Sequence, residues 1–236
     1  MSTTARTGSK ASSKTKASSR SAKNAGAPHS GMPQLIESLK EKVVLHSPAV
    51  VQALREIDRA DFLPAGQKDL AYEDTALPLE AGQTISQPYT VVFMLEQLRV
   101  RPGDVVFDVG YGSGWQTALL AQLAGPSGRV YAFEVVPELC ALGKGNLEKY
   151  PHLSKRVELV CLNARGGYGE AAPFDRIIAA AEVRAVPPAW RGQLIPGGRM
   201  VYPKGNALVL EVKKPNGSFE VREFPGFAFV PFVEEE

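Results

Sequence analysis

The stretch VVFDVGYGSGW, from Val105 to Trp115, carries the strongest structural signal in the sequence. Its first five residues are mostly apolar and predict a buried strand, and a helical pattern begins at Trp115. Glycines stand at alternate positions between the strand and the helix: Gly110, Gly112 and Gly114. Glycine lets a backbone turn approach a ligand closely and adopt angles that a β-carbon forbids. The stretch therefore predicts a strand–turn–helix unit with a ligand at the turn.

Downstream of this unit, predicted strands and helices alternate. We expect strands at 105–109, 129–135, 157–162, 175–180 and 199–203, and helices at 115–124, 137–149 and 188–194. Strands at 207–213 and 218–224 flank Pro215-Asn216-Gly217 and predict a hairpin. The alternation indicates an α/β fold with a mostly parallel sheet, helices on both faces and a C-terminal antiparallel hairpin.

Upstream, the pattern predicts three helices around a loop-rich segment. Apolar residues recur at helical spacing in the first: Leu35, Ile36, Leu39, Val43 and Val44. Ser47 is the expected N-cap of a second helix that opens with Pro48 and runs to about Ala60. Residues 61–90 read as loop-rich. A third helix should follow Pro88 with five residues facing inward: Val91, Val92, Met94, Leu95 and Leu98.

The N-terminal segment differs in composition from the rest. We expect residues 1–31 to be a disordered basic tail and residues 32–236 to form one domain, because the tail has too few large apolar side chains to form a core. The tail holds six of the 27 basic residues and no acid, which leaves 21 basic against 25 acidic residues in the domain. A solubilising tail, a transit peptide and a tether to a partner or nucleic acid remain alternatives. The mildly acidic domain makes nucleic-acid binding by its surface unexpected.

Composition also limits the cellular compartments in which we expect the protein. No apolar run approaches the roughly 20 residues of a membrane span, and no apolar segment of a secretory signal stands near the start. The two cysteines, Cys140 and Cys161, form no CxxC pair, which fits a reducing compartment and argues against a disulfide framework or a cysteine zinc site. We therefore expect a cytoplasmic protein that uses no metal and no membrane, and we expect a monomer.

The ligand at the glycine turn is constrained by two acids. Asp108 lies at the end of the strand, where it would repel a pyrophosphate and attract a cationic amino-acid end such as that of S-adenosylmethionine. The GxGxG spacing also differs from the GxGxxG of dinucleotide sites. Glu134, at the end of the next strand, is placed to accept ribose hydroxyls, and Asn163 after the third strand to contact an adenine edge. The predicted cofactor-binding residues are Asp108, Gly110, Gly112, Ser113, Gly114, Glu134 and Asn163. A plain glycine-rich turn, a surface glutamate and a turn-forming asparagine are the structural alternatives.

The histidines are outside every glycine-rich or loop motif: His29, His46 and His152. No Ser–His–acid set or HExxH motif is present, which disfavours a hydrolase.

The loop Gly82–Tyr89, GQTISQPY, resembles the signature of the protein-L-isoaspartate O-methyltransferase family. Further segments match the family in order: Arg59–Pro64, Ala71–Asp74, Asp108–Ala118, Ala172–Ile178, Gln193–Gly198 and Phe229–Phe232. The resemblance covers roughly residues 33–233 and implies a Rossmann-like class I methyltransferase. Three positions depart from the family. Leu162-Asn163-Ala164 replaces a Gly-Asp-Gly, Tyr111 replaces a small hydroxyl residue, and Tyr89 follows the Ser-x-Pro.

The resemblance implies protein-L-isoaspartate(D-aspartate) O-methyltransferase activity: methyl transfer from S-adenosylmethionine to the free carboxylate of L-isoaspartyl residues in damaged proteins. It also implies that Ser86 is the active-site residue and that Thr84 shapes the same loop. Ser86 could instead only cap the following helix. A carboxylate acceptor is already ionised at pH 7, so no general base is required. A methyltransferase for a small molecule or nucleic acid, and a NAD-type oxidoreductase or silent binding protein, remain alternative hypotheses.

Overall fold

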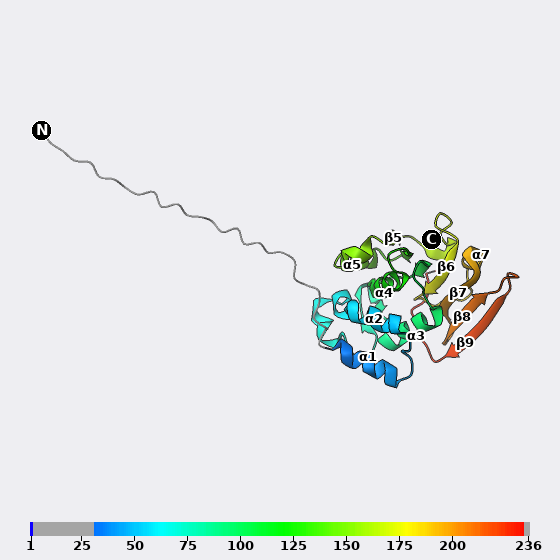
Figure 1. Ribbon diagram of the computed structural model, residues 1–236, viewed down its shortest axis with the longest axis horizontal. Coiled ribbons are helices and arrows are strands. Elements are labelled where there is room, and N and C mark those ends of the chain that lie inside the picture. Colours follow the sequence, from blue (N-terminus) through cyan, green and yellow to red (C-terminus); the bar gives the residue numbers. More distant parts are fainter. Residues whose placement is uncertain (2–30, 234–236) are drawn as a thin grey trace.

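A computed structural model describes Met1 and residues 31–233 (Figure 1). A central seven-stranded sheet has the order β5-β4-β3-β6-β7-β8-β9. The strands are β3 Val105–Val109, β4 Arg129–Glu134, β5 Val157–Cys161, β6 Phe174–Ala179, β7 Leu194–Lys204, β8 Ala207–Lys213 and β9 Phe219–Pro225. All neighbours from β5 to β7 pair in parallel, while β8 and β9 pair antiparallel. The predicted α/β sheet with a C-terminal hairpin is confirmed.

Helices cover the two faces of this sheet unequally. Most of the helical residues pack into one large core on one face, and α7 packs into a second core on the other, around Trp190. The helices are α1 Met32–Glu41, α2 Pro48–Glu56, α3 Pro88–Leu98, α4 Trp115–Ala124, α5 Pro137–Leu147, α6 Pro151–Ser154 and α7 Pro188–Gln193. The strands alternate between the faces. Phe107 and Val109 belong to the second core, while Val106 belongs to the first.

Short elements fill the loop-rich region before β3. They are η1 Arg59–Phe62, η2 Ala65–Leu70, β1 Leu77–Pro78, η3 Glu80–Gly82 and β2 Thr84–Ile85, and η4 Ala164–Gly166 follows β5. β1 pairs with β2 antiparallel, so the segment that carries Thr84 is held by a small ladder of its own. The five residues expected to face inward from α3 are all buried.

Some predicted boundaries were wrong. The first helix ends at Glu41, and Val43 is exposed in a left-handed conformation (φ 53°) rather than facing the core. The second helix ends at Glu56 instead of about Ala60, which belongs to the separate 3₁₀ helix η1. Ser47 is its N-cap residue, but the Ser47 hydroxyl donates to Glu96 instead of accepting from the helix. α6 has no counterpart in the sequence prediction.

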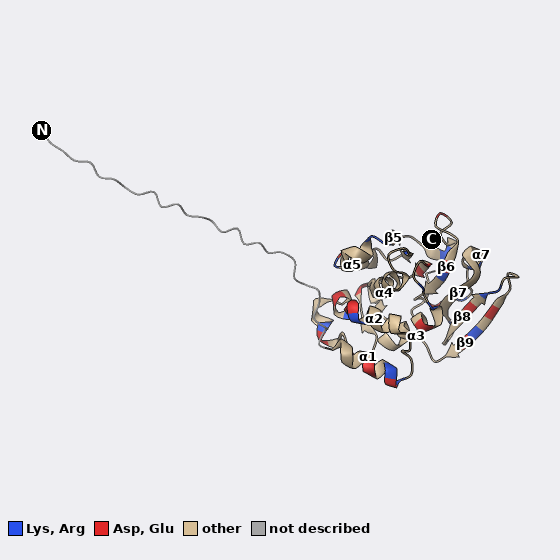
Figure 2. Ribbon diagram, in the orientation of Figure 1, with Lys and Arg blue, Asp and Glu red and all other residues tan. Residues whose placement is uncertain are grey.

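Acidic and basic residues are interspersed over the labelled elements (Figure 2). Within the described residues, no helix is long and apolar enough to cross a bilayer. Only the two ends of the predicted tail, Met1 and Gly31, are among the described residues. The last three residues of the predicted domain, 234–236, also lie outside the described residues.

Candidate active site

A cavity of about 1080 Å³ opens at the carboxyl ends of the central parallel strands. Residues at or after the ends of β3, β4, β5 and β6 line one part of it, and the 83–93 and 224–233 segments line another. β3 lies between β4 on one side and β6 on the other, so the strand order reverses at this point. Ligands of open α/β sheets bind at such a crevice.

The glycine turn forms the floor of this cavity. Gly110, Gly112 and Gly114 all adopt positive φ, at 81°, 50° and 85°. A β-carbon on Gly112 would meet no atom within 4 Å, whereas one on Gly114 would lie 3.2 Å from the Gly143 carbonyl oxygen. Gly112 is therefore open for a ligand to approach, while Gly114 is needed for close packing against α5.

Gly143 and Ser113 connect this turn to α5. A β-carbon on Gly143 would lie 2.7 Å from the Gly112 carbonyl oxygen, so α5 rests directly on the turn. Ser113 is buried and lines the cavity, and its carbonyl oxygen accepts from the Asn146 amide of the same helix at 2.9 Å. The sequence prediction missed Gly143, whose only signal is a glycine inside a helical pattern.

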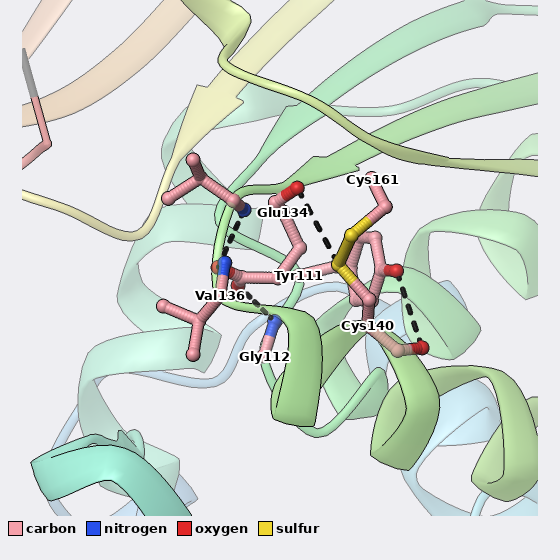
Figure 3. Close-up of a disulfide and its surroundings, with 7 residues drawn as sticks. Tyr111, Gly112, Glu134, Val136, Cys140 and Cys161 are labelled. Carbon is pink, nitrogen blue, oxygen red and sulfur yellow. Dashed lines mark hydrogen bonds between the residues drawn. A yellow bond between two sulfur atoms is a disulfide. The ribbon is translucent and has the colours of Figure 1, made fainter. Parts of the chain in front are cut away.

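Glu134 ends β4 and lines the cavity beside this turn. One carboxylate oxygen accepts from the backbone amides of Val135 and Val136, at 2.8 and 3.1 Å. The other oxygen accepts from the Gly112 amide at 3.0 Å, as Figure 3 shows. The carboxylate is thus held rigidly at the edge where a nucleoside ribose would lie.

Asp108 is not among the cavity-lining residues, and its direct contact with the cofactor stays a prediction. Its side chain is fully buried and accepts from the Gln116 amide at 2.9 Å and the Thr117 hydroxyl at 2.6 Å. Because β3 alternates between faces, Asp108 is directed beneath α4. Burial raises the pKa of Asp108 to about 6, with the two hydrogen bonds opposing the shift. Asp108 therefore ties β3 to α4 behind the glycine turn.

Asn163 lies in the cavity wall after β5. Its side-chain oxygen accepts from the Arg165 amide at 2.9 Å, and its side-chain nitrogen donates to the Val233 carbonyl at 2.9 Å. The first contact makes Asn163 the N-cap of η4, so the turn-forming role considered from the sequence is present. Contact with an adenine stays a prediction.

Thr84 and Ser86 also line the cavity. Neither hydroxyl hydrogen-bonds to any group of the described chain. The N-cap of α3 is Gln87, with no side-chain capping bond, so Ser86 does not cap that helix. The Ser86 hydroxyl is therefore available to a ligand.

Three features of the cavity were missed from the sequence. Trp115 is buried against it, and the indole Nε1 has no hydrogen-bond partner in the described structure. A wall of half-buried aromatic rings lies beyond Ser86: Tyr89, Phe93, Phe224 and Phe227, with centroids 5.0–6.5 Å apart. Lys42 is the one Lys or Arg among the cavity-lining residues of the described chain, and it pairs with Asp74 at 2.6 Å.

Cys140 and Cys161 form a disulfide, contrary to the expectation of free thiols. Cys140 lies in the first turn of α5 and Cys161 ends β5, and their Cα atoms are 5.8 Å apart. Figure 3 shows the bridge beside Tyr111 and Glu134. The Tyr111 hydroxyl donates to the Cys140 carbonyl at 3.4 Å, and burial raises the pKa of Tyr111 to about 12, with the nearby Glu134 adding to the shift. The expectation failed because it rested on sequence spacing. Parallel pairing of β4 with β5 puts Cys161 beside Glu134, and α5, which carries Cys140, begins directly after Glu134.

No group of three or more potential metal ligands occurs in the part of the chain that the structure describes.

Comparison with known proteins gives consistent matches. The family model for protein-L-isoaspartate(D-aspartate) O-methyltransferase matches residues 30–236. A Methanopyrus kandleri protein-L-isoaspartate O-methyltransferase is 39% identical over 207 residues, covering 86% of this chain and 91% of the relative. The Methanothrix thermoacetophila enzyme of the same name is 40% identical over 201 residues, covering 85% and 93%.

Solved structures agree with the fold. A Plasmodium falciparum protein described as a protein-L-isoaspartate O-methyltransferase, in complex with S-adenosyl-L-homocysteine, superposes with a TM-score of 0.79 at 23% identity. That likeness covers 88% of this chain and all of the other. A second structure, titled protein-L-isoaspartate O-methyltransferase, gives a TM-score of 0.77 at 27% identity, covering 85% of this chain and 65% of the other.

Proposed function

The chain belongs to the protein-L-isoaspartate(D-aspartate) O-methyltransferase family, and from this premise we propose how its cavity performs the reaction. The enzyme transfers a methyl group from S-adenosylmethionine to the free carboxylate of L-isoaspartyl residues in damaged proteins. The observation that carries the proposal is the shared cavity, in which the glycine turn and the Thr84–Ser86 loop face one space.

The residues of one part of the cavity fit S-adenosylmethionine. Gly112 leaves room for a close approach, and Glu134 presents a fixed carboxylate. The buried Trp115 Nε1 is a donor that finds no partner among residues 31–233. We assign Gly110, Gly112, Ser113 and Glu134 to binding the cofactor directly, and Gly114 and Asp108 to supporting the turn from behind. When bound, the cofactor supplies a methyl group on an already activated sulfonium.

The remaining steps require alignment rather than proton transfer. An isoaspartyl carboxylate is ionised at pH 7, since an ordinary carboxyl pKa is about 4. We propose that the Thr84 and Ser86 hydroxyls, which hydrogen-bond to no group of the described chain, donate to one carboxylate oxygen and leave the other free to attack the methyl group. Good alignment of two reactants supplies several kcal/mol of the barrier reduction. Ser86 would orient the acceptor and not act as a nucleophile, because no histidine or lysine of the described residues hydrogen-bonds to its hydroxyl.

The aromatic wall of Tyr89, Phe93, Phe224 and Phe227 lies beside this loop and offers apolar surface to the flanking polypeptide. We propose that the enzyme acts as a monomer, which sedimentation analysis of the active protein would test. We also propose a cytoplasmic location, which fractionation of cells would test directly.

The test is incubation with methyl-labelled S-adenosylmethionine and an isoaspartyl peptide, beside the same peptide with an ordinary aspartyl residue. We expect base-labile methyl ester on the isoaspartyl peptide alone. Equal labelling of both peptides, or none of either, would refute the assigned acceptor. Labelling of nucleic acid or a small molecule instead would favour the alternative methyltransferase.

A further inference from the structure

Arg59 is a buried cation that the reaction scheme above does not use. It begins η1, and its side chain is 0% exposed. Its two terminal nitrogens donate to main-chain carbonyls of distant segments. Nη1 reaches Ala71 at 2.9 Å, and Nη2 reaches Thr75 at 2.9 Å and Ser86 at 3.1 Å. One side chain therefore fixes the backbone of the 71–75 segment relative to the backbone of Ser86.

The same guanidinium also contacts the cofactor side of the cavity. Its central carbon lies 5.3 Å from the centre of the Trp115 ring, in a cation–π arrangement. Trp115 is the first residue of α4 and directly follows Gly114, so its ring is fixed to the glycine turn. Arg59 thus touches both the acceptor loop and the first residue after the cofactor loop.

The position of Arg59 is energetically demanding. Burial lowers the pKa of Arg59 to about 10, with Asp74 opposing the shift, so the group stays charged at pH 7. Its Nε has no hydrogen-bond partner in the described part of the chain. An apolar side chain could fill this space without desolvating a charge. Locally unfavourable choices of this kind are typical of functional sites.

We propose that Arg59 is a positioning residue that sets the distance between the Ser86 loop and the glycine turn. This inference rests on the proposed function, because the distance matters only if the two loops hold acceptor and methyl donor. Misplacement by about 1 Å of reacting groups can cost on the order of a hundredfold in rate. A lysine keeps the charge but cannot reproduce the planar fork that reaches several carbonyls at once.

The matched control is Arg176, a second buried arginine that lies outside the cavity. It is 5% exposed, pairs with Asp104 at 3.2 Å and donates to the Arg99 carbonyl at 3.1 Å. It stands near the amino end of β6, away from the carboxyl ends that form the cavity. Arg176→Lys should lower the melting temperature as Arg59→Lys does, while changing kcat/KM by less than about twofold.

The experiment compares Arg59→Lys and Arg176→Lys, each alone and combined with Ser86→Ala. Calorimetry with S-adenosylhomocysteine gives the concentration of binding-competent enzyme. Activity on the isoaspartyl peptide is divided by this concentration, so that unfolded protein does not lower the measured kcat. We expect Arg59→Lys to lower kcat about ten- to a hundredfold with little change in cofactor affinity. In the Ser86→Ala background the same change should cost less than about twofold, because the group it positions is already absent.

Several results would overturn the inference. One is an equal loss from Arg59→Lys with and without Ser86, which would show a general structural effect. Another is unchanged kcat in Arg59→Lys. If Arg59→Lys and the second variant Arg59→Gln both fail to bind S-adenosylhomocysteine while Arg176→Lys binds it, Arg59 is a folding residue and the inference is wrong. Failure of the wild-type enzyme on the isoaspartyl peptide would instead refute the proposed function.

Discussion

Removing the Cys140–Cys161 disulfide should lower stability without abolishing cofactor binding. The bridge spans 21 residues of sequence and joins α5 to the end of β5. The loop-entropy relation gives about 3 kcal/mol for a closed loop of this length. For a domain of about 200 residues, each kcal/mol moves the melting temperature by about 2–4 °C, so the expected fall is roughly 6–12 °C.

The effect on the cofactor site should be much smaller. The Glu134 carboxylate is held by the amides of Gly112, Val135 and Val136, none of which depends on the sulfur atoms. The Tyr111 hydroxyl donates to the main-chain carbonyl of Cys140, which a serine at position 140 retains. We therefore expect affinity for S-adenosylhomocysteine to change by less than about threefold.

The assay is thermal unfolding with and without a reductant, beside thiol titration of the unfolded protein. Cys161 is exposed, so a reductant can reach the bridge. The double variant Cys140→Ser, Cys161→Ser is the control. It should melt at the temperature of the reduced wild type and should not respond to reductant. Two titratable thiols per chain in protein purified without reductant, or one melting temperature under both conditions, would refute the bridge or its assigned role.

Four further predictions concern the site and the tail. Ser86→Ala should lower kcat/KM about ten- to a thousandfold while leaving cofactor affinity and melting temperature nearly unchanged, and a fully active variant would exclude Ser86 as the orienting group. Glu134→Ala should weaken cofactor binding by about 1.5–3 kcal/mol in calorimetry, since it removes a charged hydrogen-bond acceptor. Asp108→Ala should mainly lower stability, because it leaves the Gln116 and Thr117 donors buried without an acceptor. Deleting residues 2–30 should leave the melting temperature and the activity on short peptides unchanged, and a fall of several degrees would show that the tail docks on the domain.

The fold was predictable because its central elements have strong local signals. β3 and α4 begin and end at the predicted residues, since an apolar run, three glycines and a helical pattern leave no alternative register. The hairpin of β8 and β9 follows from its turn, where Gly217 has φ 83°. The end of the first helix was not predictable by apolar periodicity, because Val43 continues the pattern while leaving the helix.

The candidate site could be predicted from the sequence only where it depends on residues that are close together in the chain. The direction of Asp108 could have been inferred from strand alternation, since Phe107 and Val109 face the second core and Asp108 must face the other way. The contacts of Arg59 had no such signal. They join residues 12 to 27 positions apart through loops without periodicity. The disulfide likewise depends on strand order, which spacing alone does not give.

The reaction explains why such long-range contacts should matter in this enzyme. An ionised acceptor and an activated donor leave the protein little chemistry beyond holding two groups in line. The geometry of the cavity depends on two separate sets of long-range contacts. Arg59 joins the Ser86 loop to Trp115, and the disulfide joins α5, on which the glycine turn rests, to β5. Arg59 connects the loop that holds the acceptor to the residue that follows the cofactor loop. The disulfide connects only elements that surround the cofactor. Loss of the first should therefore appear in kcat, and loss of the second in stability.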